Sequence, residues 1–202
     1  MQHTLALAGH GVCLVPLAPP QAEQLFPLID AELWAGMAAG RPENTQGLAQ
    51  LFAARLEDPE ALPFAVMQDA TGPLIGTTGL YELSPEHGRV EVGGTFFGRA
   101  HWGSGANEAS KLLLLGYAFE SLGVCRVGFR VDTRNGRSAA ALLRMGACYE
   151  GTLRSHRAMQ DGAAGGTRID TAVFSVLDRE WPEVRARLLD RLALRDEAPD
   201  AA

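Results

Sequence analysis

Apolar residues in the first half of the chain gather in short runs separated by turn residues. Four runs rich in apolar and β-branched residues predict strands. The runs are residues 12–17, 64–67, 74–83 and 90–97. Asp69, Ala70, Thr71 and Gly72 supply turn residues between the second and third runs. The pattern therefore predicts an antiparallel meander.

Other segments carry apolar residues at spacings of three and four, which is the period of a helix with one buried face. Such helices are predicted for residues 21–33 and 48–56, and a longer one for residues 106–122, which are rich in apolar helix formers. A last helix is predicted for residues 180–195, because Pro182 suits a first turn. Its apolar stripe consists of Val184, Leu188 and Leu192.

The second half predicts further strands at residues 126–132 and 170–177, with a short helix that ends at Met145 and Gly146 between them. Residues 162–166 read GAAGG and predict a flexible tip between two strands. Strands and helices thus alternate along the chain.

Two glycines, Gly103 and Gly105, separate the strand at residues 90–97 from the helix at residues 106–122. A helix N-terminus exposes unpaired N–H groups, its dipole favours negative charge, and glycine lets a ligand approach the backbone closely. The junction therefore predicts an anion site, and a pyrophosphate is the expected guest. The alternative is that the glycines only make a tight turn.

Composition narrows the class of protein. A chain of 202 residues that is 47% hydrophobic and 21% charged is long enough for one domain with a substantial core. The formal net charge of −6 supplies no basic face for a phosphate backbone, so no nucleic-acid partner is expected.

Cysteine usage and the N-terminus suggest a location. Cys13, Cys125 and Cys148 are widely spaced and form no metal-ligand pattern, so they are expected to be buried thiols in a reducing compartment, and no metal is expected. No stretch approaches 18 uninterrupted apolar residues, and the N-terminus lacks a basic region. We therefore expect a cytoplasmic protein without a membrane partner.

Three segments in the same order resemble the GCN5-related N-acetyltransferase (GNAT) superfamily, and within it the RimJ/RimL-like branch. They are Trp102–Asn107 (WGSGAN), Asn135–Ser138 (NGRS) with Leu142, Leu143 and Gly146, and Glu150–Arg154 (EGTLR) with Asp161, Gly162 and the strand at residues 170–177. The first resembles the family's acetyl-CoA motif, with Trp102 and Asn107 departing from it. In the second, Met145 and Ala147 stand where the family has a leucine and an aromatic residue. The resemblance extends over residues 12–181.

The resemblance implies an α/β (α+β) fold, with a mixed and mostly antiparallel central sheet, helices on both faces and a splayed pair of parallel strands. We expect a single domain over residues 1–202, with a core at 12–181, a C-terminal helix at 181–195 and a frayed tail at 196–202. The family's habits and the apolar stripe of the last helix also make a homodimer an expectation.

The activity implied is transfer of an acetyl group from acetyl-CoA to a primary amine, either a protein or peptide N-terminal α-amine or an amine of a small molecule. The candidate cofactor-binding residues are Arg99, Trp102, Gly103, Ser104, Gly105, Ala106, Asn107, Asn135 and Ser138. Arg99 is included because its permanent charge lies next to the glycine turn. Residues 36–47 belong to a segment that overhangs the acceptor site in the resembling family.

Catalysis of this reaction needs a base for the protonated amine and a donor for the leaving sulfur. Ser138 is the candidate donor, and a first-turn helix serine is the alternative interpretation. Glu91 and His156 are candidate bases: Glu91 alternates with Val90 and Val92, and His156 lies where some members of the branch carry a glutamate. Asp170 ranks below both.

Two other classes of function stay open at this point. The departures in the motifs suggest a non-catalytic acyl-CoA-binding sensor or interaction module. A third interpretation is an α+β interaction protein whose glycines only turn the chain.

Overall fold

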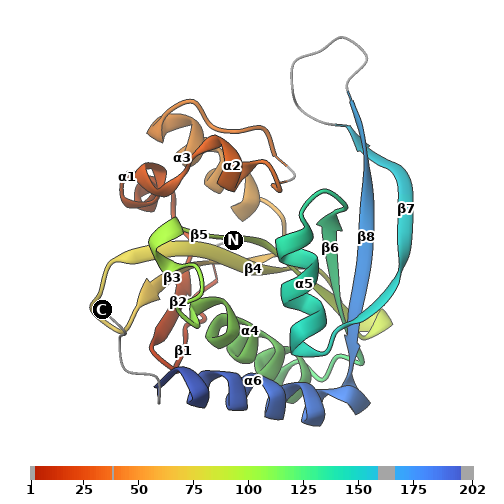
Figure 1. Cartoon of the computed structure of the whole chain (residues 1–202). Coiled ribbons are helices and arrows are strands. Elements are labelled where there is room, and N and C mark those ends of the chain that lie inside the picture. The colour runs from red at the N-terminus through yellow and green to blue at the C-terminus, as the bar shows by residue number, and fades with distance from the viewer. Residues whose placement is uncertain (1–2, 38, 159–166, 197–202) are drawn as a thin grey trace.

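An eight-stranded sheet lies at the centre of the computed structural model, which describes residues 3–37, 39–158 and 167–196 (Figure 1). The strands are β1 Leu7–Gly9, β2 Val12–Pro16, β3 Leu62–Gln68, β4 Leu74–Ser84, β5 Arg89–Phe97, β6 Arg126–Asp132, β7 Cys148–Ala158 and β8 Arg168–Leu177. Their order is β1-β2-β3-β4-β5-β6-β8-β7. Every neighbouring pair is antiparallel except β5 and β6.

The parallel pair separates partway along its length. β5 pairs with β6 only from Arg89 to Glu91, which lie opposite Arg126 to Gly128. The remaining residues of the two strands find other neighbours, β4 for β5 and β8 for β6. The expected fold, a mixed and mostly antiparallel sheet with a splayed parallel pair, is confirmed.

Helices cover both faces of this sheet (Figure 1). They are α1 Ala22–Leu25, α2 Ala31–Trp34, α3 Thr45–Leu56, α4 Ala106–Gly116, α5 Gly136–Met145 and α6 Trp181–Asp196. Alternate residues of β3 enter two separate cores: Phe64 and Val66 pack with α4, α5 and α6, whereas Ala65 packs with α1, α2 and α3. We call these the α4 face and the α1–α3 face of the sheet.

The prediction of a single helix at residues 21–33 is wrong. The segment consists of α1, a 3-10 turn from Phe26 to Leu28, and α2. Pro27 has no N–H for an intrahelical bond, and its ring crowds the preceding turn. Asp30 then starts the second helix, because its Oδ1 accepts a hydrogen bond from the Leu33 N–H at 2.8 Å.

The other expected elements agree with the structure to within a few residues. The hairpin of β3 and β4 and the strands β5, β6 and β8 are confirmed. The helix expected at 106–122 ends as an α-helix at Gly116 and continues as a π-helical turn from Tyr117 to Ser121. Strand β1 was not expected, because its three residues are too few to show an alternation of apolar and polar positions.

Two expectations about surfaces need correction. Cys125 and Cys148 are exposed, and Cys13 is half-buried, so the three thiols are not core residues. Val184 and Leu188, from the stripe that suggested a homodimer, are buried in the chain's own core.

No described helix is long and apolar enough to cross a membrane. The expected tip at residues 162–166 and most of the expected tail, residues 197–202, lie outside the described residues.

Candidate active site

The separation of β5 from β6 opens a cleft of about 590 Å³ in the middle of the sheet. A β-bulge in β5 widens it: Gly94 and Thr95 together oppose the single residue Thr78 of β4, and Gly94 has a φ of 60°. Both bulge residues line the cleft, and so do side chains from α3, α4, α5, α6 and β7. The cleft therefore reaches both faces of the sheet.

The glycine turn forms one end of this cleft. Gly103 and Gly105 have φ values of 77° and 92°, which L side chains rarely adopt, so both glycines are needed for the turn itself. The N-cap residue Gly105 has no side chain to cap α4, and among the described residues Ser104 Oγ accepts from the first N–H of the helix, that of Ala106, at 3.3 Å. Gly103, Gly105 and Asn107 line the cleft, which places the first N–H groups of α4 at its wall. This arrangement can bind an anion.

The other residues expected around the turn contact neighbouring parts of the chain. The Trp102 indole N–H donates to the Phe97 carbonyl oxygen at 2.8 Å, and the ring also lines the cleft. The Ser104 hydroxyl donates to the His101 carbonyl oxygen at 2.9 Å, and Ala106 is buried. Ser104 and Ala106 are not among the residues that line the cleft.

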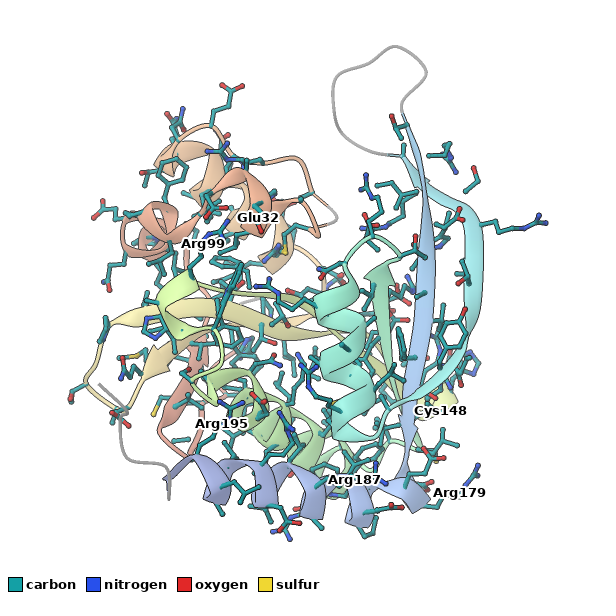
Figure 2. The ribbon with its side chains drawn as sticks, in the orientation of Figure 1. Glu32, Arg99, Cys148, Arg179, Arg187 and Arg195 are labelled. Atoms are coloured by element: carbon teal, nitrogen blue, oxygen red, sulfur yellow. The ribbon has the colours of Figure 1, made fainter. Side chains whose placement is uncertain are left out.

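Arg99 binds the neighbouring helix rather than the cleft. Its guanidinium hydrogen-bonds the Asp30 carboxylate through two nitrogens and donates to Glu32 Oε2 at 2.7 Å, as the pairing of Arg99 and Glu32 in Figure 2 shows. The Arg99 guanidinium carbon also lies 4.9 Å from the centre of the Trp102 ring. Arg137 of α5 lies closer, at 3.4 Å, and it lines the cleft, which Arg99 does not. Sequence reasoning missed Arg137, although it lies inside the motif Asn135–Ser138.

Two arginines of the C-terminal helix also reach the turn. Arg191 and Arg195 each place Nη2 near Glu108 Oε1 of α4, at 3.1 and 3.2 Å, and Figure 2 shows Arg195 between α6 and α4. Burial opposes the charge of Glu108, but the hydrogen bond from Arg191 and the charge of Arg195 hold its pKa below the usual value. Glu108 therefore orients two cations beside Gly105. Arg195 lies close to this glycine, because a Cβ at position 105 would be 3.2 Å from Arg195 Cδ.

Asn135 and Ser138 lie on the opposite wall, at the start of α5. Asn135 Oδ1 accepts a hydrogen bond from the Ser138 N–H at 3.0 Å and so caps the helix. Asn135 Nδ2 faces Gly36 closely, because a Cβ at Gly36 would lie only 2.3 Å from it. The cap thus fixes the amide between α5 and the segment that follows α2.

Lys111 of α4 is a cation that the sequence analysis did not single out. It is 6% exposed, and its Nζ donates to Thr95 Oγ1 of the bulge at 3.2 Å. No carboxylate of the described residues lies within ion-pair distance of it. Burial lowers its pKa to about 8. A lysine within the apolar helix of residues 106–122 was the signal that could have identified it.

Glu91 lines the cleft on the α1–α3 face, while its neighbours Val90 and Val92 lie in the core on the α4 face. Its Oε1 lies 2.8 Å from Arg130 Nη2 of β6. Burial raises the pKa of Glu91, and the nearby Arg130 charge opposes this shift. The side chain is 20% exposed, so it remains accessible to a substrate.

The remaining candidate bases, His156 and Asp170, lie on the paired strands β7 and β8. His156 lines the cleft and its Nδ1 is 3.1 Å from Thr171 Oγ1. Asp170 Oδ1 accepts from the Ser155 N–H at 2.7 Å, which ties the strongly bent backbone at Ser155, φ 52°, to β8. Asp170 therefore has a structural role, whereas His156 faces the cleft.

Within the described part of the chain, no three His, Cys, Asp or Glu side chains are placed to hold a metal ion.

Known proteins resemble this chain in sequence and fold. The chain is 34% identical over 122 residues to the "Uncharacterized N-acetyltransferase p20" of Bacillus licheniformis; the match covers 60% of this chain and 65% of the relative. A solved structure from T. thermophilus named as a putative acetyltransferase is 35% identical, with a TM-score of 0.85 over 95% of this chain and 99% of that one. Mycobacterium smegmatis RimJ, solved with CoA-disulfide, shares the fold at 20% identity, with a TM-score of 0.72 over 95% and 94% of the two chains.

The acetyltransferase (GNAT) domain family matches residues 12–147, a segment that includes the splayed strands, the glycine turn and all of α5. With the same fold found in a structure 35% identical over nearly the whole chain, this protein belongs to the GNAT acetyltransferase family.

Proposed function

We propose that this protein is an acetyl-CoA-dependent N-acetyltransferase whose acceptor is a primary amine. The observation that carries the proposal is the N-terminus of α4, whose N-cap is a glycine and which opens through Gly103 and Gly105 into a cleft at the splay of β5 and β6. Anionic phosphates fit such a terminus, and the family uses acetyl-CoA. The CoA-disulfide bound to RimJ, a protein of the same fold, supports a CoA molecule as the ligand.

The residues of the cleft suggest how the cofactor would be held. The pyrophosphate would accept hydrogen bonds from the amides of the glycine turn and the first turn of α4, with Arg191 and Arg195 supplying charge. Asn135 and Ser138, on the facing wall, would lie along the pantetheine arm. Lys111 would donate to the cofactor from beneath the bulge.

Glu91 is the proposed general base. A protonated amine has no free lone pair, so the base must remove one proton before nitrogen attacks the thioester carbonyl. In the transfer, the N–C bond forms, the C–S bond breaks, and the nitrogen gives up its second proton. The CoA thiolate takes up a proton, for which Ser138 is the proposed donor, and the proton lost by nitrogen restores the Ser138 hydroxyl. A carboxylate with a raised pKa is a stronger base than an ordinary glutamate, and Glu91 meets this condition. His156 is the second candidate.

The assignment to the RimJ/RimL-like branch also remains a proposal. It is supported by the segment Glu150–Arg154 and by the fold shared with RimJ. In this chain Glu150 binds Arg126 at 2.6 Å and accepts from Ser175 at 2.8 Å, which ties β7 to its neighbours in the sheet. An N-terminal α-amine and a small-molecule amine are both acceptors within the proposal.

The cofactor site is tested by calorimetric titration of acetyl-CoA into the wild type and into Asn107→Asp. Asn107 is the second residue of α4, where an aspartate stabilises the helix but repels a phosphate. We expect at least about tenfold weaker binding, because a unit charge at contact distance is worth more than 1.4 kcal/mol. The matched control is Gln46→Glu, the same change in charge at the second residue of α3, away from the cleft.

The competing function is a non-catalytic acyl-CoA sensor, which would bind acetyl-CoA at the same turn. Release of free CoA thiol in the presence of an amine distinguishes the two. Binding that is weakened by Asn107→Asp but never followed by amine-dependent CoA release would favour the sensor, and no binding by the wild type would refute both.

A further inference from the structure

The α1–α3 face of the cleft holds polar atoms that have no partner inside the described part of the chain. Arg55 Nη1 of α3, Tyr81 Oη of β4 and Arg157 Nε of β7 are buried and form no hydrogen bond with a described residue. All three side chains line the cleft. Buried polar atoms are nearly always paired in folded proteins, so three orphans in one cavity point to a ligand.

One of these residues, Tyr81, lies beside the proposed base. Tyr81 is directly opposite Glu91 in the β4–β5 ladder, so the two side chains share a face and their Cβ atoms are neighbours. The Tyr81 hydroxyl lies at the bulge, since a Cβ at Gly94 would be 2.5 Å from it. Burial raises the pKa of Tyr81, so the phenol stays protonated and can donate a hydrogen bond. The positive charge of Arg55 acts on this hydroxyl.

Arg55 is a cation whose charge the described residues do not neutralise. No carboxylate among them lies within ion-pair distance of its guanidinium, and the nearby Asp58 uses Oδ1 to accept from the Glu60 N–H at 2.9 Å. Both acids found in the described lining of the cleft are already paired: Glu91 with Arg130, and Glu108 with Arg191 and Arg195. A partly buried cation without a counter-charge is costly, and an anionic group of the ligand would remove that cost.

We propose that the acceptor amine carries a carboxylate group, which Arg55 and Tyr81 bind beside Glu91, with Arg157 contributing from β7. This inference rests on the proposed acetyltransferase function and names its substrate class. A guanidinium fork and a phenol hydroxyl together match the two oxygens of a carboxylate. Although the net charge of −6 favours cationic acceptors, the described residues that line the cleft include eight Arg and Lys side chains and two carboxylates, so their field favours an anionic group.

The test compares acceptors that differ only in this group. Small amino acids are paired with their carboxamides, and short peptides with glutamate at the second position are paired with peptides that carry glutamine there. The wild type should prefer the carboxylate member at least about tenfold in kcat/KM, because hydrogen bonds to charged groups contribute about 1.5–3 kcal/mol. The two formats show whether the carboxylate belongs to a small molecule or to a peptide.

Arg55→Met retains an unbranched apolar stem and removes the charge. This variant should reduce the preference for the carboxylate from about tenfold to about twofold or less, because the charge-assisted hydrogen bond that causes the preference is lost. Arg55→Lys should keep part of it, and the control Arg179→Met, at an exposed position far from the cleft in Figure 2, should keep all of it. Acetyl-CoA affinity, measured by calorimetry, should be the same in all four proteins and reports whether they are folded.

Two outcomes would overturn the inference: no preference for the carboxylate in the wild type, or a preference that survives Arg55→Met. If acetyl-CoA binds but no amine is acetylated, the proposed function fails instead. The inference is then still decided by calorimetric titration of the same pairs into the acetyl-CoA complex, where the carboxylate members should bind more tightly than the amides.

Discussion

At the scale of single residues, the Glu91–Arg130 pair makes a prediction about pH. The amine is activated only when Glu91 is ionised, so kcat/KM should rise with pH through a pKa above the ordinary value of 4.5 for glutamate. Arg130 holds that pKa down, so Arg130→Met should move the rise to higher pH. Glu91→Gln should lower kcat about 10²–10⁴-fold. A profile that does not move in Arg130→Met would remove Glu91 from the role of base.

Lys111 makes a prediction about stability. Its pKa is 10.5 in an unfolded chain and about 8 in the fold, which corresponds to a cost of roughly 3 kcal/mol whenever the folded lysine is protonated. Lys111→Met should therefore raise the free energy of unfolding near pH 7 by up to about this amount. Between pH 8 and 10.5 the unfolded wild type binds more protons than the folded one, so the wild type gains stability with rising pH and the difference shrinks.

Urea unfolding of both proteins near pH 7 and near pH 10 measures this. A variant that is no more stable than the wild type near pH 7 would show that the lysine carries no burial penalty. If Lys111 also binds the cofactor, the more stable variant should bind acetyl-CoA more weakly. The ammonium would then be retained for binding at the expense of stability.

Residue-scale reasoning from sequence succeeded where the cause is local. Alternation along one strand placed Glu91 on the face opposite Val90 and Val92, as the structure shows. It could not foresee that Arg99 binds Asp30 and Glu32, because those partners are 69 and 67 positions away in the chain. Which charge neutralises which is decided by the tertiary fold.

At the scale of elements, the start of α5 combines helix capping with a wall of the cleft. Asn135→Ala should lower the free energy of unfolding by about 1 kcal/mol and also weaken acetyl-CoA binding, because the same amide serves both. The matched control is Asn44, which caps α3 by accepting from the Gly47 N–H at 2.8 Å and does not line the cleft. Asn44→Ala should cost similar stability and leave the affinity unchanged. Equal losses of affinity in both variants would make the Asn135 effect purely structural.

Element boundaries were predictable where a capping or breaking residue is read correctly. Helix α4 begins at Ala106, where the sequence predicts it. Gly105 before it has a left-handed backbone conformation, which an α-helix does not contain. The break between α1 and α2 was missed although Pro27 stands in the segment, because the spacing of Leu25, Leu28 and Ile29 fits a continuous helix. Apolar period and proline gave opposite predictions there, and the proline was decisive.

At the scale of the whole molecule, the cofactor end of the cleft is assembled from distant parts of the chain. Arg195 meets Glu108 across 87 positions, and α6 closes the wall that α4 begins. The C-terminal helix was predicted, but its contact with the glycine turn was not. The spacing of apolar residues identifies the buried side of a helix, but it does not tell which charged residues next to that side reach another helix.

The distribution of charge predicts how the cofactor associates. The protein and acetyl-CoA are both net negative at neutral pH, so their overall charges repel. Yet the part of the cleft lining that the structure describes carries eight basic and two acidic side chains. Charges near the site dominate at short range, because the Debye length falls from roughly 30 Å at about 0.01 M salt to about 8 Å at 0.15 M.

The association rate constant, measured by stopped flow, should therefore fall as salt rises over this range. The double variant Arg191→Gln/Arg195→Gln should associate more slowly at low salt and respond less to added salt. Arg179→Gln/Arg185→Gln, at two exposed positions that do not line the cleft, is the control for the same change in net charge. An association rate that rises with salt in the wild type would mean that the net charge of −6 outweighs the cleft, and that the arginines of α6 do not steer the cofactor.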